Sequence, residues 1–262
     1  MAQSLALATT MMPRITPANA ANPLAAPELL LDAAGPLKVV YAPFDHIETR
    51  ARLVVVGITP GLTQAVNALQ AATAAMHQGQ SLETCLAAAK LTASFSGGAI
   101  RNNLIAMLDA IGVARHFNVP STSEMFRPGA QDVHFTSALR YPVFVEGKNY
   151  NGTPDMLTTP ILRKQIDTHL AEEARALSHA IWLPLGPKAE AAVSHLARHG
   201  LLPSDHVLTG MPHPSGANAE RVAIFLGRKR PEDASRQTNP APLLAAFARL
   251  KTQIANIERS AA

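Results

Sequence analysis

The chain has 262 residues, of which 47% are hydrophobic and 16% charged, so it can bury one sizeable core. Its net charge of +4 permits a nucleic-acid partner without requiring one. The single cysteine, Cys85, excludes an internal disulfide and any four-cysteine zinc or iron–sulfur site, and no apolar run approaches the roughly 18 residues of a membrane span. We therefore expect a cytoplasmic protein that does not enter the membrane.

The N-terminal segment differs in composition from the rest. The first 27 residues are rich in Ala, Thr, Pro and Asn, and no basic residue precedes Arg14, which argues against a secretory signal, although a signal peptide remains the alternative. We expect residues 1–27 to be a flexible leader, or an arm lying over the domain, and residues 28–262 to form a single domain.

The first strong structural signal is the β-branched run Leu53 to Val56. It leads into Gly57-Ile58-Thr59-Pro60-Gly61, and a helix is expected over residues 62–77. A continuous apolar strand followed by a glycine-bounded turn and a helix is typical of a buried parallel strand. The glycine spacing matches neither the phosphate-binding P-loop nor the dinucleotide fingerprint, so it indicates only a sharp turn that a ligand can approach.

Strands and helices alternate along the rest of the chain. Further helices are expected over residues 81–90, 99–112, 161–178, 187–198, 217–226 and 243–257, and further strands over 134–139, 180–186 and 207–208. Residues 140–152 are expected to form a long irregular loop. The alternation predicts an α/β three-layer sandwich, in which helices cover both faces of a central four-stranded parallel sheet.

The segment with the most chemical content is Met211-Pro212-His213-Pro214-Ser215-Gly216, which follows the last predicted strand. Two prolines hold the backbone extended, so the imidazole is presented with little freedom. Ligands of open α/β sheets bind at this edge, beyond the carboxyl ends of the strands. His213 is therefore a candidate functional residue, and an ordinary loop histidine is the alternative.

Other candidates have equally plain alternatives. Phe95 precedes two glycines and is either a platform for stacking a ring or a core residue. The run Arg228-Lys229-Arg230 is either a phosphate contact or a solvated surface. His195 and His199 have the spacing of a metal pair but lack the adjacent Glu, so we expect no metal. Without a Gly-x-Ser-x-Gly elbow, Ser215 is a poor nucleophile candidate.

Taken together and in order, these segments resemble the uracil-DNA glycosylase superfamily over roughly residues 50 to 230. The 57–61 turn resembles its first catalytic motif, Gly-x-Asp/Asn-Pro. Phe95-Ser96-Gly97 and the helix after it resemble the Phe-x-Gly stretch of the family 4 enzymes. Thr136-Ser137-Ala138-Leu139-Arg140 resembles Thr-Asn-hydrophobic-hydrophobic-Lys, and His213-Pro214-Ser215 matches the second catalytic motif, His-Pro-Ser.

The resemblance implies a role for each candidate. His213 would donate a hydrogen bond to the departing base, and Phe95 would stack on the base once it is flipped from the duplex. Gly57, Ile58, Pro60 and Ser137 would complete the base pocket. The implied DNA contacts are the amides of Ser215 and Gly216, the groove-entering Asn218, and the cations Arg228, Lys229 and Arg230.

Two departures from the family pattern bear on the substrate. Thr59 stands where the family has the Asp or Asn that positions water, and a hydroxyl cannot act as a base at neutral pH. Ser137 stands where the family has the Asn that reads the pyrimidine edge, which leaves room. We therefore expect a bulkier or modified base, such as a hypermodified cytosine in foreign DNA, rather than plain uracil, with residues 140–152 contacting the modification.

The expected function is thus a monofunctional DNA glycosylase that leaves an abasic site in single- or double-stranded DNA, as a monomer and without a cofactor. Three alternatives stay open: a catalytically silent DNA- or nucleotide-binding module of the same fold, a covalent trap that captures the sugar, and a classical uracil-DNA glycosylase of base excision repair. The sequence does not decide between a role in repair and one in defence against phage DNA.

Overall fold

The computed structural model describes residues 5–96 and 99–260, which form an α/β fold. Its centre is a parallel sheet with strand order β4-β3-β7, built from Val133–Ser137, Leu53–Gly57 and Ile181–Pro184. β3 lies in the middle and every residue of it is buried, as expected of a continuous apolar strand that is covered on both faces.

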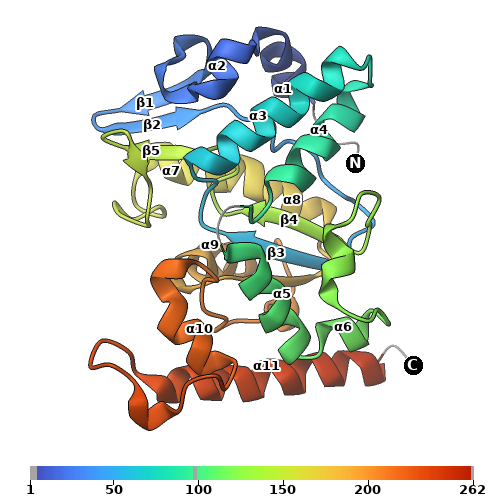
Figure 1. The fold of residues 1–262 in the computed structure, drawn as a ribbon, viewed down its shortest axis with the longest axis vertical. Coiled ribbons are helices and arrows are strands. Elements are labelled where there is room, and N and C mark those ends of the chain that lie inside the picture. Colours follow the sequence, from blue (N-terminus) through green and yellow to red (C-terminus); the bar gives the residue numbers. More distant parts are fainter. Residues whose placement is uncertain (1–4, 97–98, 261–262) are drawn as a thin grey trace.

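Helices cover both faces of this sheet (Figure 1). One face carries α3 Leu62–His77, α4 Leu82–Ala93, α7 Pro160–Gln165, α8 Ala171–Ala176 and α9 Pro187–Arg198, with a π-helical turn, Ile166–Leu170, between α7 and α8. The other carries α5 Ile100–Ala110, α6 Val113–His116, α10 Ala219–Phe225 and α11 Pro240–Ser260.

The side chains of β3 alternate between two hydrophobic clusters. Val54 and Val56 belong to the cluster under α3, α4 and α9, whereas Leu53 and Val55 belong to the cluster under α5, α10 and α11. This period of two is the strand pattern, and here both faces are apolar. The predicted α/β fold with helices on both faces of a parallel sheet is confirmed.

The predicted fourth strand does not form as a regular strand. Residues 207–211 make only two isolated parallel bridges with the β7 side of the sheet, Trp182 with Val207 and Leu185 with Met211. Gly210 has a φ of +98° and interrupts the extended backbone between them. The described residues therefore give a three-stranded parallel sheet, and the predicted four-stranded one is not confirmed.

A second, antiparallel sheet was not predicted. Its order is β1-β2-β5-β6, from Leu30–Ala34, Leu37–Val40, Val143–Val145 and Lys148–Asn149. The prediction of an irregular loop over residues 140–152 is therefore wrong for the β5–β6 hairpin. Glu146 and Gly147 form its two-residue turn with φ values of 50° and 76°, the geometry that suits a tight hairpin.

The N-terminal segment packs against the domain from Leu5 onward. It contains α1 Ala6–Met11 and α2 Pro17–Ala21, followed by short 3₁₀ turns. Ala8, Met11 and Ala20 are buried in the same cluster as α3. From Leu5 onward this part of the chain lies over the domain as an arm. Among the helices in the described ranges, none has the length and apolar character that a membrane span requires.

One buried carboxylate joins several of these elements. Glu173 of α8 is fully buried and accepts from Arg140 Nε at 2.8 Å, and its oxygens lie 3.8 Å from Lys90 Nζ of α4 and 3.3 Å from His134 Nε2 of β4. Burial by itself would raise the pKa of Glu173, but Lys90, Arg140 and His134 outweigh it and hold that pKa well below its usual range. We call Glu173, Lys90, His134 and Arg140 the buried ion cluster.

We expect Glu173→Gln to lower the free energy of unfolding by about 3–5 kcal/mol, because it leaves two buried cations without their shared counter-ion. Urea unfolding at pH 7 measures this. Since the folded-state pKa of Glu173 lies below its unfolded value, the stabilisation is present above pH about 4.3 and is lost as the pH falls further, so the difference from wild type should shrink in acid.

The neighbouring Glu172→Gln is the matched control. Its side chain is 28% exposed and meets Arg140 Nη1 at 3.0 Å, so we expect a much smaller loss than for Glu173. Equal losses in the two variants would contradict the assignment of Glu173 as the central counter-ion.

Candidate active site

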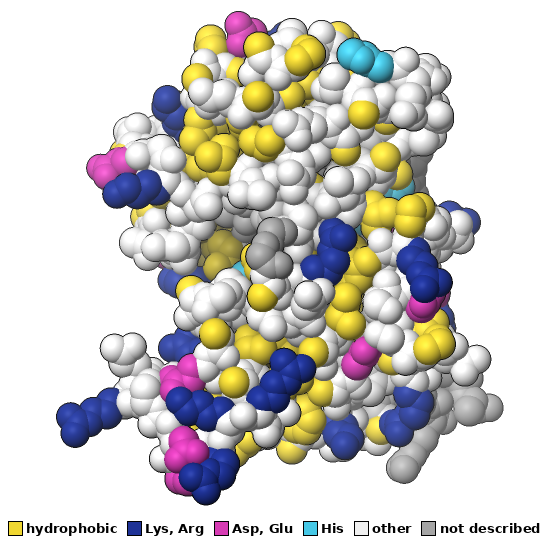
Figure 2. Space-filling view, in the orientation of Figure 1, with side chains coloured by type: hydrophobic (Ala, Val, Ile, Leu, Met, Phe, Trp, Pro, Cys, Tyr) yellow, Lys and Arg dark blue, Asp and Glu magenta, His cyan; other side chains and the backbone are white. Residues whose placement is uncertain are grey.

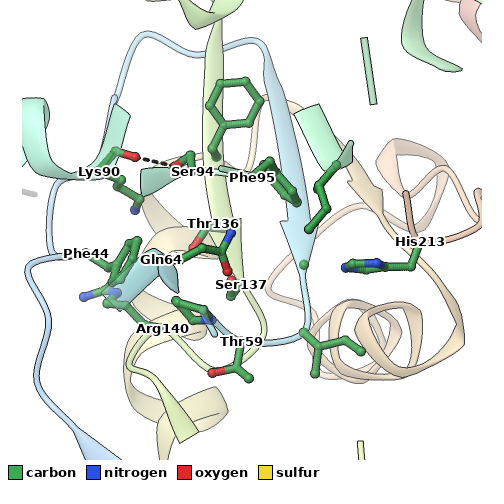
Figure 3. Close-up of a pocket in the computed structure, with 15 residues that line it drawn as sticks. Phe44, Thr59, Gln64, Lys90, Ser94, Phe95, Thr136, Ser137, Arg140 and His213 are labelled. Atoms are coloured by element: carbon green, nitrogen blue, oxygen red, sulfur yellow. Dashed lines mark hydrogen bonds between the residues drawn. The ribbon is translucent and has the colours of Figure 1, made fainter. Parts of the chain in front are cut away.

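A cavity of about 90 Å³ lies at the carboxyl ends of β3 and β4, where Gly57 and Ser137 are paired in register. It brings together side chains from distant parts of the sequence (Figure 3). All residues predicted to bind the base or to act in catalysis line it, namely Gly57, Ile58, Thr59, Pro60, Phe95, Ser137 and His213.

His213 enters the cavity as a neutral hydrogen-bond donor. The Ser215 N–H donates to His213 Nδ1 at 3.3 Å, so the proton of the neutral ring sits on Nε2. Burial lowers the pKa of His213, which keeps the ring uncharged at neutral pH. Figure 3 shows the ring pointing toward Ser137 from one side of the cavity.

The histidine turn is held from two directions. Asn103 Nδ2 of α5 donates to the carbonyl of Pro214 at 3.0 Å. On the other side Gly186 has a φ of +82°, and a Cβ there would lie 3.5 Å from His213 Cβ. The turn is therefore fixed by packing and hydrogen bonds as well as by its prolines, so the imidazole is preorganised.

Phe95 forms another wall of the cavity and has an unusual backbone. Its φ of +49° is rare for a bulky residue and persists only where the surroundings impose it. The ring packs edge-on against Phe135, with centroids 5.7 Å apart. A Cβ on Gly57 would lie 3.5 Å from both the Phe95 ring and the Ser137 hydroxyl, so these three residues meet at the sheet edge. Gly97 of the Phe-x-Gly match lies outside the described residues.

The Thr59 hydroxyl is hydrogen-bonded to backbone atoms in and next to β5 of the antiparallel sheet. The hydroxyl donates to the carbonyl of Tyr141 at 3.2 Å and accepts from the N–H of Val143, also at 3.2 Å. The proton that would orient a water is thus already used in joining the end of β3 to β5. This geometry gives Thr59 a structural role, and its role in positioning water stays a prediction.

Several lining residues were not singled out from the sequence. Gln64 accepts from the Gly61 N–H through Oε1 at 2.9 Å, which leaves its amide N–H groups for the cavity. Lys90 and Arg140 of the buried ion cluster also line the cavity, as do Phe44, Ser94, Ile100, Phe135 and Thr136. Arg140 and Thr136 lie within the second-strand motif, which could have revealed them. Gln64 and Lys90 lie inside helices whose spacing gives no such signal.

The cavity opens into a larger groove of about 1160 Å³. Ile58, Thr59, Gln64, Ile100 and His213 line both spaces and so form the opening between them. Figure 2 shows the surface hollowed at mid-height on the left of the view, with Lys and Arg side chains above and below the hollow. The groove is also lined by Asn149 of β6, by Tyr150 and Asn151 directly after it, by Lys188 of α9, and by Arg221 of α10.

The predicted DNA contacts in the histidine turn are partly used within the protein. Ser215 and Asn218 line the groove, and Gly216 is exposed beside them. However, the Ser215 N–H is bonded to His213, and Asn218 Nδ2 donates to Ser215 Oγ at 3.1 Å. The side-chain oxygen of Asn218, Oδ1, accepts a hydrogen bond from Arg221 Nη1 at 3.3 Å. The Ser215 amide is therefore not free for a phosphate, and Asn218 folds back onto its own loop.

The predicted basic cluster lies outside the groove lining and is partly neutralised. Lys229 forms an ion pair with Glu220 at 2.6 Å, and Arg230 pairs with Asp233 at 2.9 Å. Arg228 is exposed.

In the described part of the chain, no three His, Cys, Asp or Glu side chains are grouped so that they could hold a metal.

Comparison with known proteins supplies a relative. The chain is 37% identical over 215 residues to a protein from Bacillus subtilis (strain 168) named "Uncharacterized protein YoxB", covering 81% of this chain and 83% of the relative. The chain belongs to the YoxB family. No protein-family model matches the chain. No solved structure matches it either. Membership of the YoxB family therefore leaves the chemistry of the site to be argued from its geometry.

We expect Thr59→Val to lower the free energy of unfolding by about 1–3 kcal/mol, because it leaves the Val143 N–H and the Tyr141 carbonyl without their partner. Thr59→Ser keeps both hydrogen bonds and should remain close to wild type. Urea unfolding of the two variants, with hydrogen exchange at the Val143 amide, measures the effect. A Thr59→Val variant as stable as wild type would contradict the structural role.

Proposed function

We propose that this protein is a monofunctional DNA glycosylase, which takes a base flipped out of DNA, hydrolyses its bond to the sugar and leaves an abasic site. The observation that carries the proposal is the neutral His213, whose Nε2–H faces a cavity at the sheet edge opposite Phe95 and Ser137. Supporting it are the order and spacing of the motifs that resemble the uracil-DNA glycosylase superfamily.

Cleavage of the bond between base and sugar requires a hydrogen-bond donor and a stacking surface, and the cavity is lined by groups of both kinds. Breaking the bond leaves an oxocarbenium-like sugar and an electron-rich base, so catalysis consists largely in stabilising the departing base. His213 would donate to the base oxygen on which charge builds, and Phe95 would stack on the ring. Among the described residues that line the cavity there is no Asp or Glu, so leaving-group stabilisation would contribute more than activation of water.

The sheet and the groove fit the same proposal. The parallel bridges of residues 207–211 beside β7 support a reading of this segment as an irregular fourth strand, with His213 just beyond its carboxyl end. The groove would hold the DNA strand, while the target nucleotide passes the opening at Ile58 and His213.

The size of the cavity bears on the base. Its volume of about 90 Å³ is below the roughly 150 Å³ of a cavity that binds benzene, so the base ring would fill it and extend into the opening. A bulky substituent of the kind considered from the sequence would have to project into the groove, toward Asn149 and Asn151. We therefore favour a compact modified pyrimidine over a large one.

A second candidate function is a DNA- or nucleotide-binding module without catalysis. It is favoured by one specific observation, namely that the Thr59 hydroxyl is bonded to the backbone where the related enzymes hold a water-positioning Asp or Asn. The two candidates differ in whether DNA acquires abasic sites.

We expect wild-type protein to produce alkali-sensitive breaks in DNA that carries its target base, and His213→Ala to lower the rate by about 10²–10³-fold, the usual cost of losing one donor to a developing oxyanion. The substrates are single- and double-stranded DNAs containing uracil, cytosine or modified pyrimidines. His77→Ala, at the exposed end of α3, is the control. DNA binding without breaks on every substrate would favour the non-catalytic module.

We expect groove cations to contribute more to DNA binding than the basic cluster after α10. Lys188 lines the groove and is only loosely paired, 3.9 Å from Asp155, whereas Arg230 is bonded to Asp233. Lys188→Gln should reduce the slope of log affinity against log salt by about 1, and Arg230→Gln should change it little. A larger effect of Arg230→Gln would move the DNA path away from the groove.

A further inference from the structure

The cavity has two chemically different ends. His213, Gln64 and Ile58 stand where it opens to the groove, so they belong to the end that the sugar of a bound nucleotide would occupy. Lys90 and Arg140 line the cavity but not the groove. Figure 3 shows them with Phe44 on the side away from His213. A base held here would turn the edge far from its sugar toward these two cations.

Both cations are buried, yet neither uses all its donors within the protein. Lys90 is 4% exposed and Arg140 is 3% exposed. Lys90 Nζ donates to the His46 carbonyl at 2.7 Å, and it lies 3.4 Å from His134 Nε2 and 3.8 Å from Glu173, the last beyond hydrogen-bond distance. Arg140 gives Nε to Glu173, one Nη1 proton to Glu172 and one Nη2 proton to the His169 carbonyl. An ammonium has three protons and a guanidinium five, so donors remain on both groups.

The negative charges of this region are not among the residues that line the cavity. Glu172, Glu173 and Asp45 do not line the cavity, and none of its described lining residues is acidic. A neutral base edge at this position would gain an ordinary hydrogen bond. A carboxylate would gain short, charge-assisted ones, which are roughly twice as strong, and it would meet no like charge in the lining.

We propose that the inner end of the cavity selects a pyrimidine that carries a carboxylate on the edge far from the sugar, with Lys90 and Arg140 as the residues that determine this specificity. The inference rests on the proposed function, of which it names the substrate class. A carboxylate is also compact, which suits a small cavity better than a large neutral modification does.

The protonation state of Lys90 makes the predicted binding of a carboxylate depend on pH. Burial, with Arg140 nearby, lowers the pKa of Lys90 to about 8, although Glu173 acts in the opposite direction. The other titratable groups that face it are Asp45 and His46 from the segment before β3, His134 of β4, and Glu172 of α8. Lys90 is thus charged at pH 7 and loses its proton as the pH rises through about 8, so affinity for a carboxylate should fall there.

The test uses free bases, so it does not depend on excision. Titration calorimetry of the full chain with 5-carboxyuracil and with uracil at pH 7 should give at least about tenfold tighter binding of the carboxylated base, because charge-assisted hydrogen bonds replace neutral ones. Between pH 7 and pH 9 that preference should decline. Equal affinities, a preference unchanged by pH, or no binding of 5-carboxyuracil at millimolar concentration would each overturn the inference.

Variants tie the preference to Lys90. Lys90→Met should abolish it, and Lys164→Met is the matched control, because Lys164 pairs with Asp32 on the surface with a side chain that is 73% exposed. If Lys90→Met does not fold, as its melting curve would show, the pH profile of the wild-type protein still decides the question. A folded Lys90→Met variant that keeps the preference would overturn the inference.

The assay on DNA separates this inference from the glycosylase proposal. Excision of plain and carboxylated pyrimidines at equal rates would support the glycosylase and overturn the inference. Lys90-dependent binding of 5-carboxyuracil without breaks in any DNA would support the carboxylate site and overturn the glycosylase.

Discussion

The buried carboxylate of Glu173 is the interaction on which the site depends most. It is shared by Lys90 of α4, His134 of β4 and Arg140 just beyond β4, so a single side chain fixes a helix, a strand and the loop that follows the strand. Placing these charges in the interior carries a large desolvation cost that only mutual pairing offsets. The same pairing aims two cations at the inner end of the cavity, so the arrangement that holds the fold also shapes the chemistry of the pocket.

The second constraint is the junction of the two sheets at Thr59. Its hydroxyl joins the end of β3 to the backbone around β5, and Asn149 of the β5–β6 hairpin accepts from the Leu62 N–H at the start of α3 at 2.9 Å. The hairpin is therefore fixed to the glycine turn and the first turn of the helix. In this way the antiparallel sheet, which buries Val39 and Phe144 in the cluster it shares with β3, also provides one wall of the groove.

Sequence patterns were sufficient where structure is local. The spans expected for α3 and α9 agree with those observed, because each carries its own periodicity and its own start signal, the glycine turn before α3 and the proline at the start of α9. Of the residues predicted for the cavity, those after β3 and Ser137 of β4 lie together because strand ends of a parallel sheet meet at one edge. Phe95, after α4, and His213, beyond the bridges of residues 207–211, reach the same edge from loops.

What the patterns missed is non-local. β2 pairs with β5, which comes from far later in the chain, and a short strand shows its partner only through register. Lys90 is a residue type that is usually solvated, and its burial in α4 accompanies its position beside Glu173, which sequence spacing does not show. Likewise, Gln64 faces the cavity because the Gly61 N–H holds its carbonyl oxygen, a contact that spacing cannot indicate.

The electrostatics of the cavity bear on whether the proposed glycosylase could work with Thr59 in place of an Asp or Asn. A base that leaves as an anion would meet the neutral N–H of His213 at the outer end and the charges of Lys90 and Arg140 at the inner end, so the developing charge would be stabilised along the whole ring. A neutral imidazole suits this task, because another cation there would further raise the cost of burying Lys90. The more the leaving group is stabilised, the less the reaction would depend on an activated water. On this view the positive inner end and the missing water-positioning carboxylate are two parts of one arrangement.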